Sequence, residues 1–325
     1  HGWLRPAVWG YCMWRKYHDG IADTELISGR ELLRREPNFN KKTRFAISNP
    51  DSGCVCPYGL TIAYAENAVQ NGARIAHIGV GFGGPVDARS GCVLGSMQIS
   101  GWSDFPLKTY LEEKTGLPVR VYNDTDAATW GEYRLGAGRG TRNFFYTNIG
   151  SGVGGGAVLN GQLYLAQGRG SMEFGQSYTV GAADTAERVE ALCSGWAVEH
   201  CLRQAKIPPA SVLSAKQQEI LTCQDWAEAI RSEDAYACAL LDRHAYRFSV
   251  GLSNVIALLD PEVLAIGGGV ALLGEPLLSR LRTQTERLVY GIYRGSYRIE
   301  TAKLQEDAVP LGVLRLLAEE TEALQ

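Results

Sequence analysis

Residues 147–156 read Thr-Asn-Ile-Gly-Ser-Gly-Val-Gly-Gly-Gly, and this stretch decides how the rest of the chain is interpreted. A β-type run at 143–146 precedes it, and Ala157-Val158-Leu159 follow before an Asn-Gly pair. The pattern predicts a strand, a glycine-rich turn and a second strand. Its glycines leave backbone N–H groups unshielded, so the turn could bind a polyphosphate. The alternative is a tight β hairpin in which glycine only permits positive φ.

Neither common nucleotide motif is present in this stretch. It lacks the Gly-x-x-x-x-Gly-Lys-Ser/Thr pattern, and no Gly-x-Gly-x-x-Gly opens a helix with an acidic partner downstream. The surrounding sequence therefore has to decide between the two interpretations.

Length and composition are those of a globular protein with a sizeable core. The 325 residues favour two domains over one, and 45% of them are hydrophobic. With 32 basic and 35 acidic residues the net charge is -3, which predicts no nucleic-acid or membrane partner. No apolar run has the length of a membrane span and no signal segment is seen, so we expect a cytoplasmic protein. The 8 cysteines are scattered, which indicates reduced thiols; the close pair Cys54 and Cys56 lacks a second pair, so no metal site is predicted.

The first fifty or so residues differ from those that follow. Tryptophans stand at positions 3, 9 and 14, and no strand or helix periodicity is sustained. The chain also begins with His1, so we interpret its start as a fragment or a damaged reading frame.

From residue 61 onward, strand and helix patterns alternate, which predicts an α/β fold with mixed sheets. The expected helices span 61–71, 107–114, 127–132, 186–204, 226–259, 277–288 and a segment from 311. The expected strands, besides those at the glycine stretch, span 75–80, 118–122, 263–266 and 297–301.

Candidate site residues lie at the ends of these strands. Asp124 stands where a strand meets a helix, and Gly267-Gly268-Gly269 follow an apolar strand. Since α/β proteins bind ligands at strand ends, these features and the glycine stretch are consistent with a nucleotide near a carboxylate. The alternatives are a helix N-cap for Asp124 and a simple strand terminator for the second glycine run.

Several motifs, in order and spacing, carry a family resemblance from about Ala73 to the end of the chain. They are Gly81-Phe-Gly-Gly-Pro-Val-Asp87, Gly101-Trp102, Asn123-Asp124, Gly131-Glu132, Gly136-Ala-Gly-Arg-Gly140, Ile149–Gly156, Glu173-Phe-Gly175, Ser194-Gly195 and Pro261–Val270. With them the chain resembles the ROK family of bacterial sugar kinases and related repressors. The resemblance implies an actin-like (ribonuclease H-like) ATPase fold with two α/β lobes around a cleft. The smaller lobe is expected at 1–134 with 309–325, and the larger at 135–308.

The resemblance also implies roles for single residues. Asp124 would be the general base that takes the proton of the attacking sugar hydroxyl. The sugar would be bound by Asn123, Glu173, Gln176, Glu190 and Gly84. The ATP phosphates, with Mg²⁺, would meet Gly150, Ser151, Gly152, Gly154 and Gly155, and the adenosine would meet Gly267, Gly268 and Gly269.

Five departures from the family pattern bear on these roles. Gln176 stands where the family has a histidine that binds sugar and zinc. Residues 177–189 also contain none of the family's zinc-binding cysteines. No structural zinc is therefore expected. Cys193 is interpreted as a core thiol. The family's first phosphate turn, Asp-x-Gly-Gly-Thr, has no counterpart beyond a remnant at 18–20. Asp126 and Gln98 both stand where the family often has asparagine, and the alternative for Asp126 is a solvated first-turn residue.

The leading hypothesis is therefore an ATP-dependent kinase of a hexose or N-acetylhexosamine. The rival hypothesis is an impaired ROK protein that binds sugar as a sensor or degenerate kinase. DNA binding is disfavoured because the N-terminal segment shows no pair of amphipathic helices. Dimers are common in the family, so a homodimer is one expectation, which no residue of this sequence tests.

Overall fold

The computed structural model describes residues 25–28, 30–31, 34, 45–48, 71–72, 74–96, 99, 101–168, 172–216 and 220–323. The chain forms two compact units, His1–Ile75 and Ala76–Gln325. In the first unit, strands β1 (Glu25–Ser28) and β2 (Phe45–Ser48) pair antiparallel, with Leu26 opposite Ile47. Residues 61–70 of the helix expected at 61–71, the cysteines at 54 and 56, the remnant at 18–20 and Gln98 lie outside the described residues, and Asn71 is in a turn.

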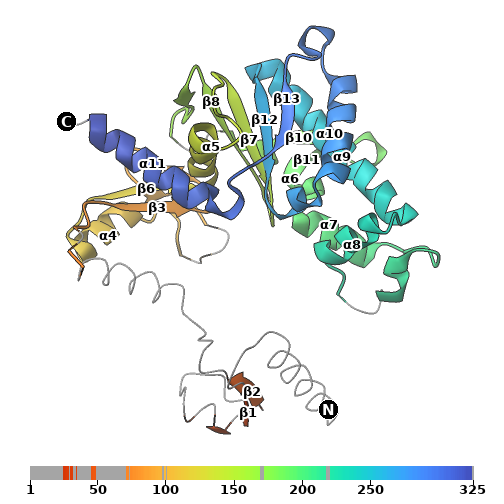
Figure 1. Cartoon of the computed structure of the whole chain (residues 1–325), viewed down its shortest axis with the longest axis horizontal. Helices are drawn as coiled ribbons and strands as arrows, with labels where there is room; N and C mark the ends of the chain where they lie inside the picture. Colours follow the sequence, from red (N-terminus) through yellow and green to blue (C-terminus); the bar gives the residue numbers. More distant parts are fainter. Residues whose placement is uncertain are drawn as a thin grey trace. The chain divides into compact units, whose positions relative to one another are not determined.

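The second unit opens with a small parallel strand pair (Figure 1). Strand β3 (Ile78–Phe82) lies beside β6 (Val119–Asn123), so that Phe82 and Asn123 end the pair at the same edge. A short hairpin of β4 (Val86–Asp87) and β5 (Cys92–Val93) follows β3. This register places the loop after β3 next to the start of the helix after β6.

Helices cover this strand pair. Helix α4 (Leu107–Thr115) precedes β6, helix α5 (Asp124–Leu135) follows it, and helix α11 (Ala308–Ala323) packs on α5 and β3. The close approach of α11 depends on glycine: a Cβ on Gly79 or Gly81 would meet the side chains of Val313 and Val309.

A five-stranded mixed sheet forms the centre of the rest of the second unit. Its order is β13 (Arg298–Thr301), β12 (Val263–Gly267), β7 (Phe144–Ile149), β8 (Val153–Leu159) and β9 (Gln162–Leu163). Strand β12 runs parallel to β7 and β13, whereas β8 pairs antiparallel with β7, and β9 pairs antiparallel with β8. The predicted mixed sheet and the strand–turn–strand arrangement around the glycine stretch are confirmed.

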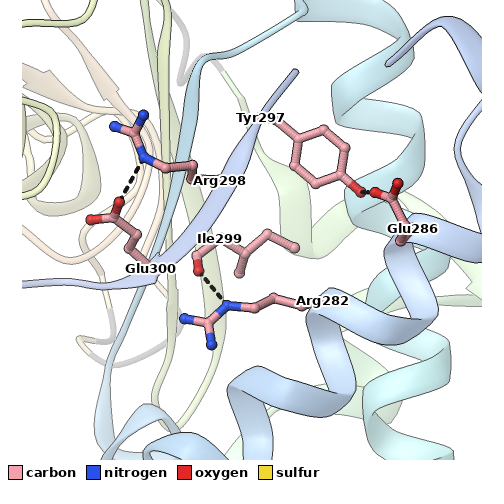
Figure 2. Close-up of a pocket in the computed structure, with 6 residues that line it drawn as sticks. All are labelled: Arg282, Glu286, Tyr297, Arg298, Ile299 and Glu300. Carbon is pink, nitrogen blue, oxygen red and sulfur yellow. Dashed lines mark hydrogen bonds and ion pairs between the residues drawn. The ribbon is translucent and has the colours of Figure 1, made fainter. Parts of the chain in front are cut away.

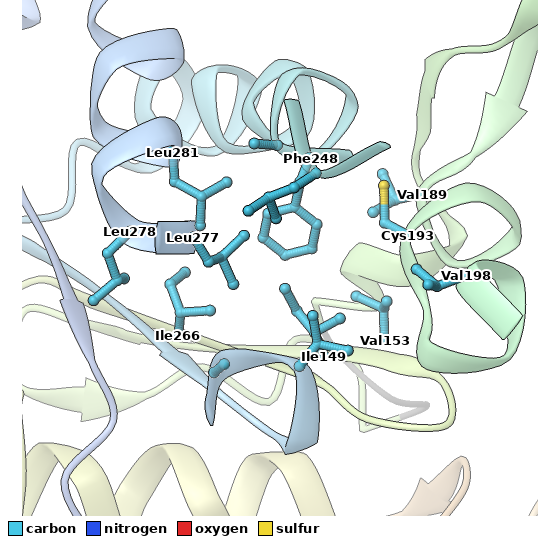
Figure 3. Close-up of a cluster of buried hydrophobic side chains, with 14 of the residues drawn as sticks. Ile149, Val153, Val189, Cys193, Val198, Phe248, Ile266, Leu277, Leu278 and Leu281 are labelled. Carbon is cyan, nitrogen blue, oxygen red and sulfur yellow. The ribbon is translucent and has the colours of Figure 1, made fainter. Parts of the chain in front are cut away.

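The helices that surround this sheet pack on it through a core of buried apolar side chains (Figure 3). Ile149 and Ile266 face Phe248 of α9 (Ala235–Leu259) and Leu277 and Leu281 of α10 (Glu275–Leu288), and all five are fully buried. Burying each such side chain contributes about 1.5 to 3 kcal/mol. None of the helices in the described part of the chain is both long enough and apolar enough to span a membrane.

Two long helices expected from the sequence are each divided. Residues 186–204 form strand β11 (Ala186–Arg188), helix α6 (Val189–Cys193) and helix α7 (Gly195–Gln204), because Ser194 is extended and its Oγ caps α7 by accepting from the Ala197 N–H at 3.1 Å. Residues 226–259 form α8 (Cys223–Arg231) and α9, because Asp234 caps α9. Boundaries also differ by a few residues elsewhere: the strand expected at 75–80 is β3, and the last helix begins at Ala308 rather than 311.

Candidate functional site

The glycine stretch is a hairpin whose tip is open. Ile149 pairs with Val153, which leaves Gly150, Ser151 and Gly152 as the turn, closed by a 2.9 Å hydrogen bond from the Gly150 N–H to the Gly152 carbonyl. A Cβ on Gly150 would meet no atom within 4 Å. On the Gly150 side the turn therefore faces open space, as an anion-binding turn requires.

The later glycines of the stretch have a packing role. Gly154 and Gly155 lie inside β8, and a Cβ on Gly155 would stand 2.6 Å from the Phe174 Cβ and 2.7 Å from the Met172 carbonyl oxygen. A Cβ on Gly154 would stand 2.6 Å from Asn148 Oδ1. Close packing accounts for these two glycines, and their contact with phosphate stays a prediction.

The second glycine run lies beside this hairpin. Gly267 pairs with Asn148 in the parallel register of β12 and β7, and Gly268 has a φ of 84°. A Cβ on Gly268 would stand 2.6 Å from the backbone of Ile149, whereas one on Gly269 would meet nothing within 4 Å. The structure thus brings the two predicted nucleotide turns to one edge of the sheet.

Asn123 ends β6 and caps helix α5. Its Oδ1 accepts from the N–H groups of Thr125 at 2.9 Å and Asp126 at 3.0 Å, and its Nδ2 donates to the Gly84 carbonyl at 2.9 Å. The capping side chain is therefore Asn123, and the alternative in which Asp124 is the N-cap is wrong. The same bonds join Gly84 to the start of α5.

Asp124 is the first residue of α5, and Thr125 bonds to one of its two carboxylate oxygens. Its Oδ1 accepts from the Thr125 N–H at 2.7 Å and from Thr125 Oγ1 at 3.3 Å. Oδ2 accepts no hydrogen bond from the described residues and lies against Gly83, where an added Cβ would be 3.3 Å away. Burial raises the pKa of this carboxyl, and the hydrogen bonds from Thr125 oppose the rise.

Further carboxylates surround Asp124. Asp126 is 5% exposed, and its Oδ1 has no hydrogen-bond partner among the described residues, so the solvated alternative is wrong. Burial, with the charges of Glu173 and Asp124, raises the pKa of Asp126 to about 7. Burial, with the charges of Glu190 and Asp124, also raises the pKa of Glu173. These charge effects indicate that Asp124, Asp126, Glu173 and Glu190 lie near one another.

Glu190 and Gln176 meet at the start of α6. Glu190 Oε1 accepts from Gln176 Nε2 at 3.1 Å, and Glu190 Oε2 accepts from the Val153 N–H at 3.0 Å. Gln176 Oε1 accepts from Arg188 Nη1 at 2.9 Å. Sequence reasoning did not select Arg188, because only the turn between β10 (Tyr178–Val180) and β11 brings it back to Gln176.

Cys193 is a fully buried thiol beside this group, as predicted. Burial raises its pKa to about 12, so it stays protonated and packs as an apolar group.

A separate hollow lies at α10 and β13, and none of the site residues described above lines it (Figure 2). It has a volume of about 390 Å³ and is lined by Arg282, Glu286, Tyr297, Arg298, Ile299 and Glu300. Its polar groups have protein partners: Arg298 Nε donates to Glu300 Oε1 at 2.9 Å, Tyr297 donates to Glu286 Oε2 at 3.0 Å, and Arg282 Nη1 donates to Glu275 at 2.7 Å. We therefore place the candidate site at the glycine turns and the carboxylates.

Comparison with known families identifies the family of this chain. The model of the ROK family matches residues 46–320. A model of FAD dependent oxidoreductases matches residues 7–77, most of the segment that the sequence set apart, and overlaps the start of the ROK match.

Similar proteins include named sugar kinases. The glucokinase of Halalkalibacterium halodurans is 30% identical over 252 residues, which cover 72% of this chain and 74% of the relative. The N-acetylmannosamine kinase of Haemophilus influenzae is 32% identical over 225 residues, which cover 67% and 69%. The crystal structure of a ROK family glucokinase from Streptomyces griseus in complex with glucose and AMPPNP matches with a TM-score of 0.68 and 28% identity, covering 84% of this chain and 90% of that one. The expected actin-like ATPase fold is thereby confirmed.

Proposed function

Because this chain belongs to the ROK family, we propose that it is an ATP-dependent kinase of a hexose or N-acetylhexosamine, with Asp124 as its general base. The observation that carries the proposal is the convergence of Asp124, Glu173 and Glu190 beside an open glycine turn. The names of the relatives, glucokinase and N-acetylmannosamine kinase, support the substrate class but do not select one sugar.

The residues present fit ATP. Ser151 is exposed at the hairpin tip, Gly150 has open space where a Cβ would stand, and Gly269 leaves open space beside the neighbouring turn. Backbone N–H groups in such turns bind phosphate oxygens. Among the described residues no three acidic, histidine or cysteine side chains converge as metal ligands, so the divalent cation, which we expect to be Mg²⁺, would be carried mainly on the ATP phosphates.

The residues also fit a polyol. A sugar needs several fixed acceptors and donors, and the site offers carboxylate oxygens from Glu173 and Glu190 and amide groups from Asn123 and Gln176. After its bonds to Gly84 and the helix, Asn123 still has one amide hydrogen to donate. Such fixed groups would orient one hydroxyl toward Asp124.

Asp124 would then act on that hydroxyl. As the sugar oxygen bonds to the γ-phosphorus and the bond from phosphorus to the β-phosphate oxygen breaks, the hydroxyl proton passes to Asp124 Oδ2, leaving sugar phosphate and ADP. ATP supplies the phosphoryl group, and catalysis consists mostly of positioning and charge neutralisation. A positioned base of this kind typically contributes about 10² to 10⁴ in rate. Because ATP and free sugars are cytoplasmic metabolites, the proposed place of action is the cytoplasm.

The test is sugar-dependent ADP release by the full chain, measured against glucose, mannose, N-acetylglucosamine and N-acetylmannosamine, with product mass determined by mass spectrometry. We expect turnover with at least one of them and a product heavier by one phosphoryl group. Sugar binding without turnover would instead identify a sensor or degenerate kinase. The absence of both binding and turnover would contradict the proposal.

A further inference from the structure

A line of hydrogen bonds runs from an exposed arginine to the glycine hairpin. Arg188 donates to Gln176, Gln176 donates to Glu190, and Glu190 accepts from the backbone of Val153, the first residue of β8. We propose that Arg188 is a positioning residue of the sugar site, which fixes the Gln176 amide and, through it, the Glu190 carboxylate. This inference rests on the proposed sugar-binding function and assigns a role that the sequence motifs do not include.

The chemistry of Arg188 determines which way the Gln176 amide faces. A guanidinium only donates hydrogen bonds, so the amide atom that faces it must be the oxygen, here at 2.9 Å from Nη1. The amide nitrogen then faces Glu190, to which it donates at 3.1 Å. If the amide turned over, its oxygen would face a carboxylate that can only accept. Arg188 therefore favours the one orientation in which Gln176 and Glu190 attract each other.

Glu190 connects the Gln176 amide to the backbone of the glycine hairpin. Its two oxygens accept from opposite directions, Oε1 from Gln176 and Oε2 from the Val153 N–H at 3.0 Å. The approach is close enough that a Cβ on Gly152 would stand 2.6 Å from Oε2, which explains a glycine there. Each group keeps capacity for a ligand: Gln176 has a second amide hydrogen, and Glu190 has unused lone pairs.

The β10–β11 hairpin holds Arg188 in place. Arg188 pairs with Tyr178, and the Val189 N–H donates to the Ser177 carbonyl at 2.9 Å. Thr179 Oγ1 donates to the Arg247 carbonyl of α9 at 2.6 Å, which ties the hairpin to the core. The backbone of Arg188 is thus fixed by the fold, while its exposed side chain can be replaced without opening a cavity.

The test measures sugar affinity by calorimetry in wild type, Arg188→Met and Arg188→Lys, using the hexose that binds wild type best. We expect Arg188→Met to weaken sugar binding about fivefold to tenfold, as for loss of a charged hydrogen bond, while the KM for ATP stays within about twofold. Arg188→Lys keeps a charged donor and should recover part of the loss. Arg298→Met, at an exposed arginine of β13 whose bond is to Glu300, is the matched control and should bind sugar as wild type does.

A double variant separates positioning from general support. If Arg188 acts through Gln176, then Arg188→Met adds about twofold or less to the loss caused by Gln176→Leu. Independent, multiplicative losses contradict the proposal, as does wild-type affinity in Arg188→Met. A fall in melting temperature with equal losses for sugar and ATP also contradicts it, since that indicates a structural role. If wild type binds sugar without phosphorylating it, the proposed kinase activity is refuted, but the sugar affinities of the variants can still be compared. If wild type binds no sugar, both the kinase activity and the positioning role of Arg188 are refuted.

Discussion

Replacing Asp126 by asparagine should stabilise the protein, and more so as the pH rises. Asp126 is 5% exposed, its Oδ1 has no partner among the described residues, and its pKa is raised from 3.8 to about 7 by burial and by the charges of Glu173 and Asp124. The folded protein therefore binds this proton more tightly than the unfolded chain does. Below pH 3.8 the carboxyl is neutral in both states and costs nothing. As pH rises from 3.8 toward about 7, the unfolded chain gains from ionisation and stability is lost.

The two pKa values set the size of the effect. A full shift from 3.8 to about 7 makes the folded protein about 4 kcal/mol less stable at alkaline pH. At about pH 5 the same linkage gives about 2 kcal/mol, and at about pH 8 it gives about 4 kcal/mol. Asparagine does not ionise. The gain from Asp126→Asn should therefore be about 2 to 3 kcal/mol larger at about pH 8 than at about pH 5, whatever the packing of the new amide.

The assay compares unfolding free energies from urea titrations at these two pH values, with thermal melts as a second readout. For a unit of this size, about 2 to 3 kcal/mol corresponds to roughly 5 °C in melting temperature. Asp260→Asn is the control, because Asp260 is exposed and its φ of 45° suits asparagine. A gain that is the same at both pH values, to within about 0.5 kcal/mol, would refute the reasoning, since Asp126 would then be ionised without penalty.

Other substitutions test the roles assigned to Gly150 and Gly155 and the role of the buried Glu132 carboxylate of α5. Gly150→Ala should leave stability unchanged, because its Cβ meets nothing within 4 Å, while raising the KM for ATP; an unchanged KM would remove Gly150 from the phosphate site. Gly155→Ala should instead destabilise by about 1 to 3 kcal/mol through overpacking, measured by urea unfolding, and a neutral result would contradict the packing role. Glu132→Ala should cost about 2 to 4 kcal/mol, because the buried carboxylate accepts from the N–H groups of Ala137 at 2.8 Å and Leu304 at 2.6 Å; wild-type stability would show that water replaces it.

Much of the fold was predictable because local signals agreed with the tertiary structure. The aromatic and β-branched run before Gly150 and the apolar run before Gly267 are strands, and the polar residues after β6 begin a helix. The two divided helices show where such reasoning stops. An apolar periodicity continues across 186–204 and 226–259, and only the extended backbone at Ser194 and the cap at Asp234 end one helix and begin the next.

The candidate site was predictable in its residue types but not in its environment. The position of Asp124 after a strand identified it, whereas the burial of Asp126 depends on what packs over the first turn of α5, which no local pattern encodes. Arg188 is selected only by the register of β10 and β11. The lobe boundaries, the sugar contacts and the phosphate contacts stay predictions, since they depend on ligands and on residues outside the described part.

The central claim is that Asp124 removes the proton of the attacking hydroxyl. Asp124→Asn keeps the shape of the side chain and can still accept at Oδ1 from Thr125, so sugar affinity should stay within a few-fold of wild type. Single-turnover phosphorylation, measured on the sugar that wild type uses best, should fall by about 10² to 10⁴. Phosphorylation at the wild-type rate in Asp124→Asn would contradict the account.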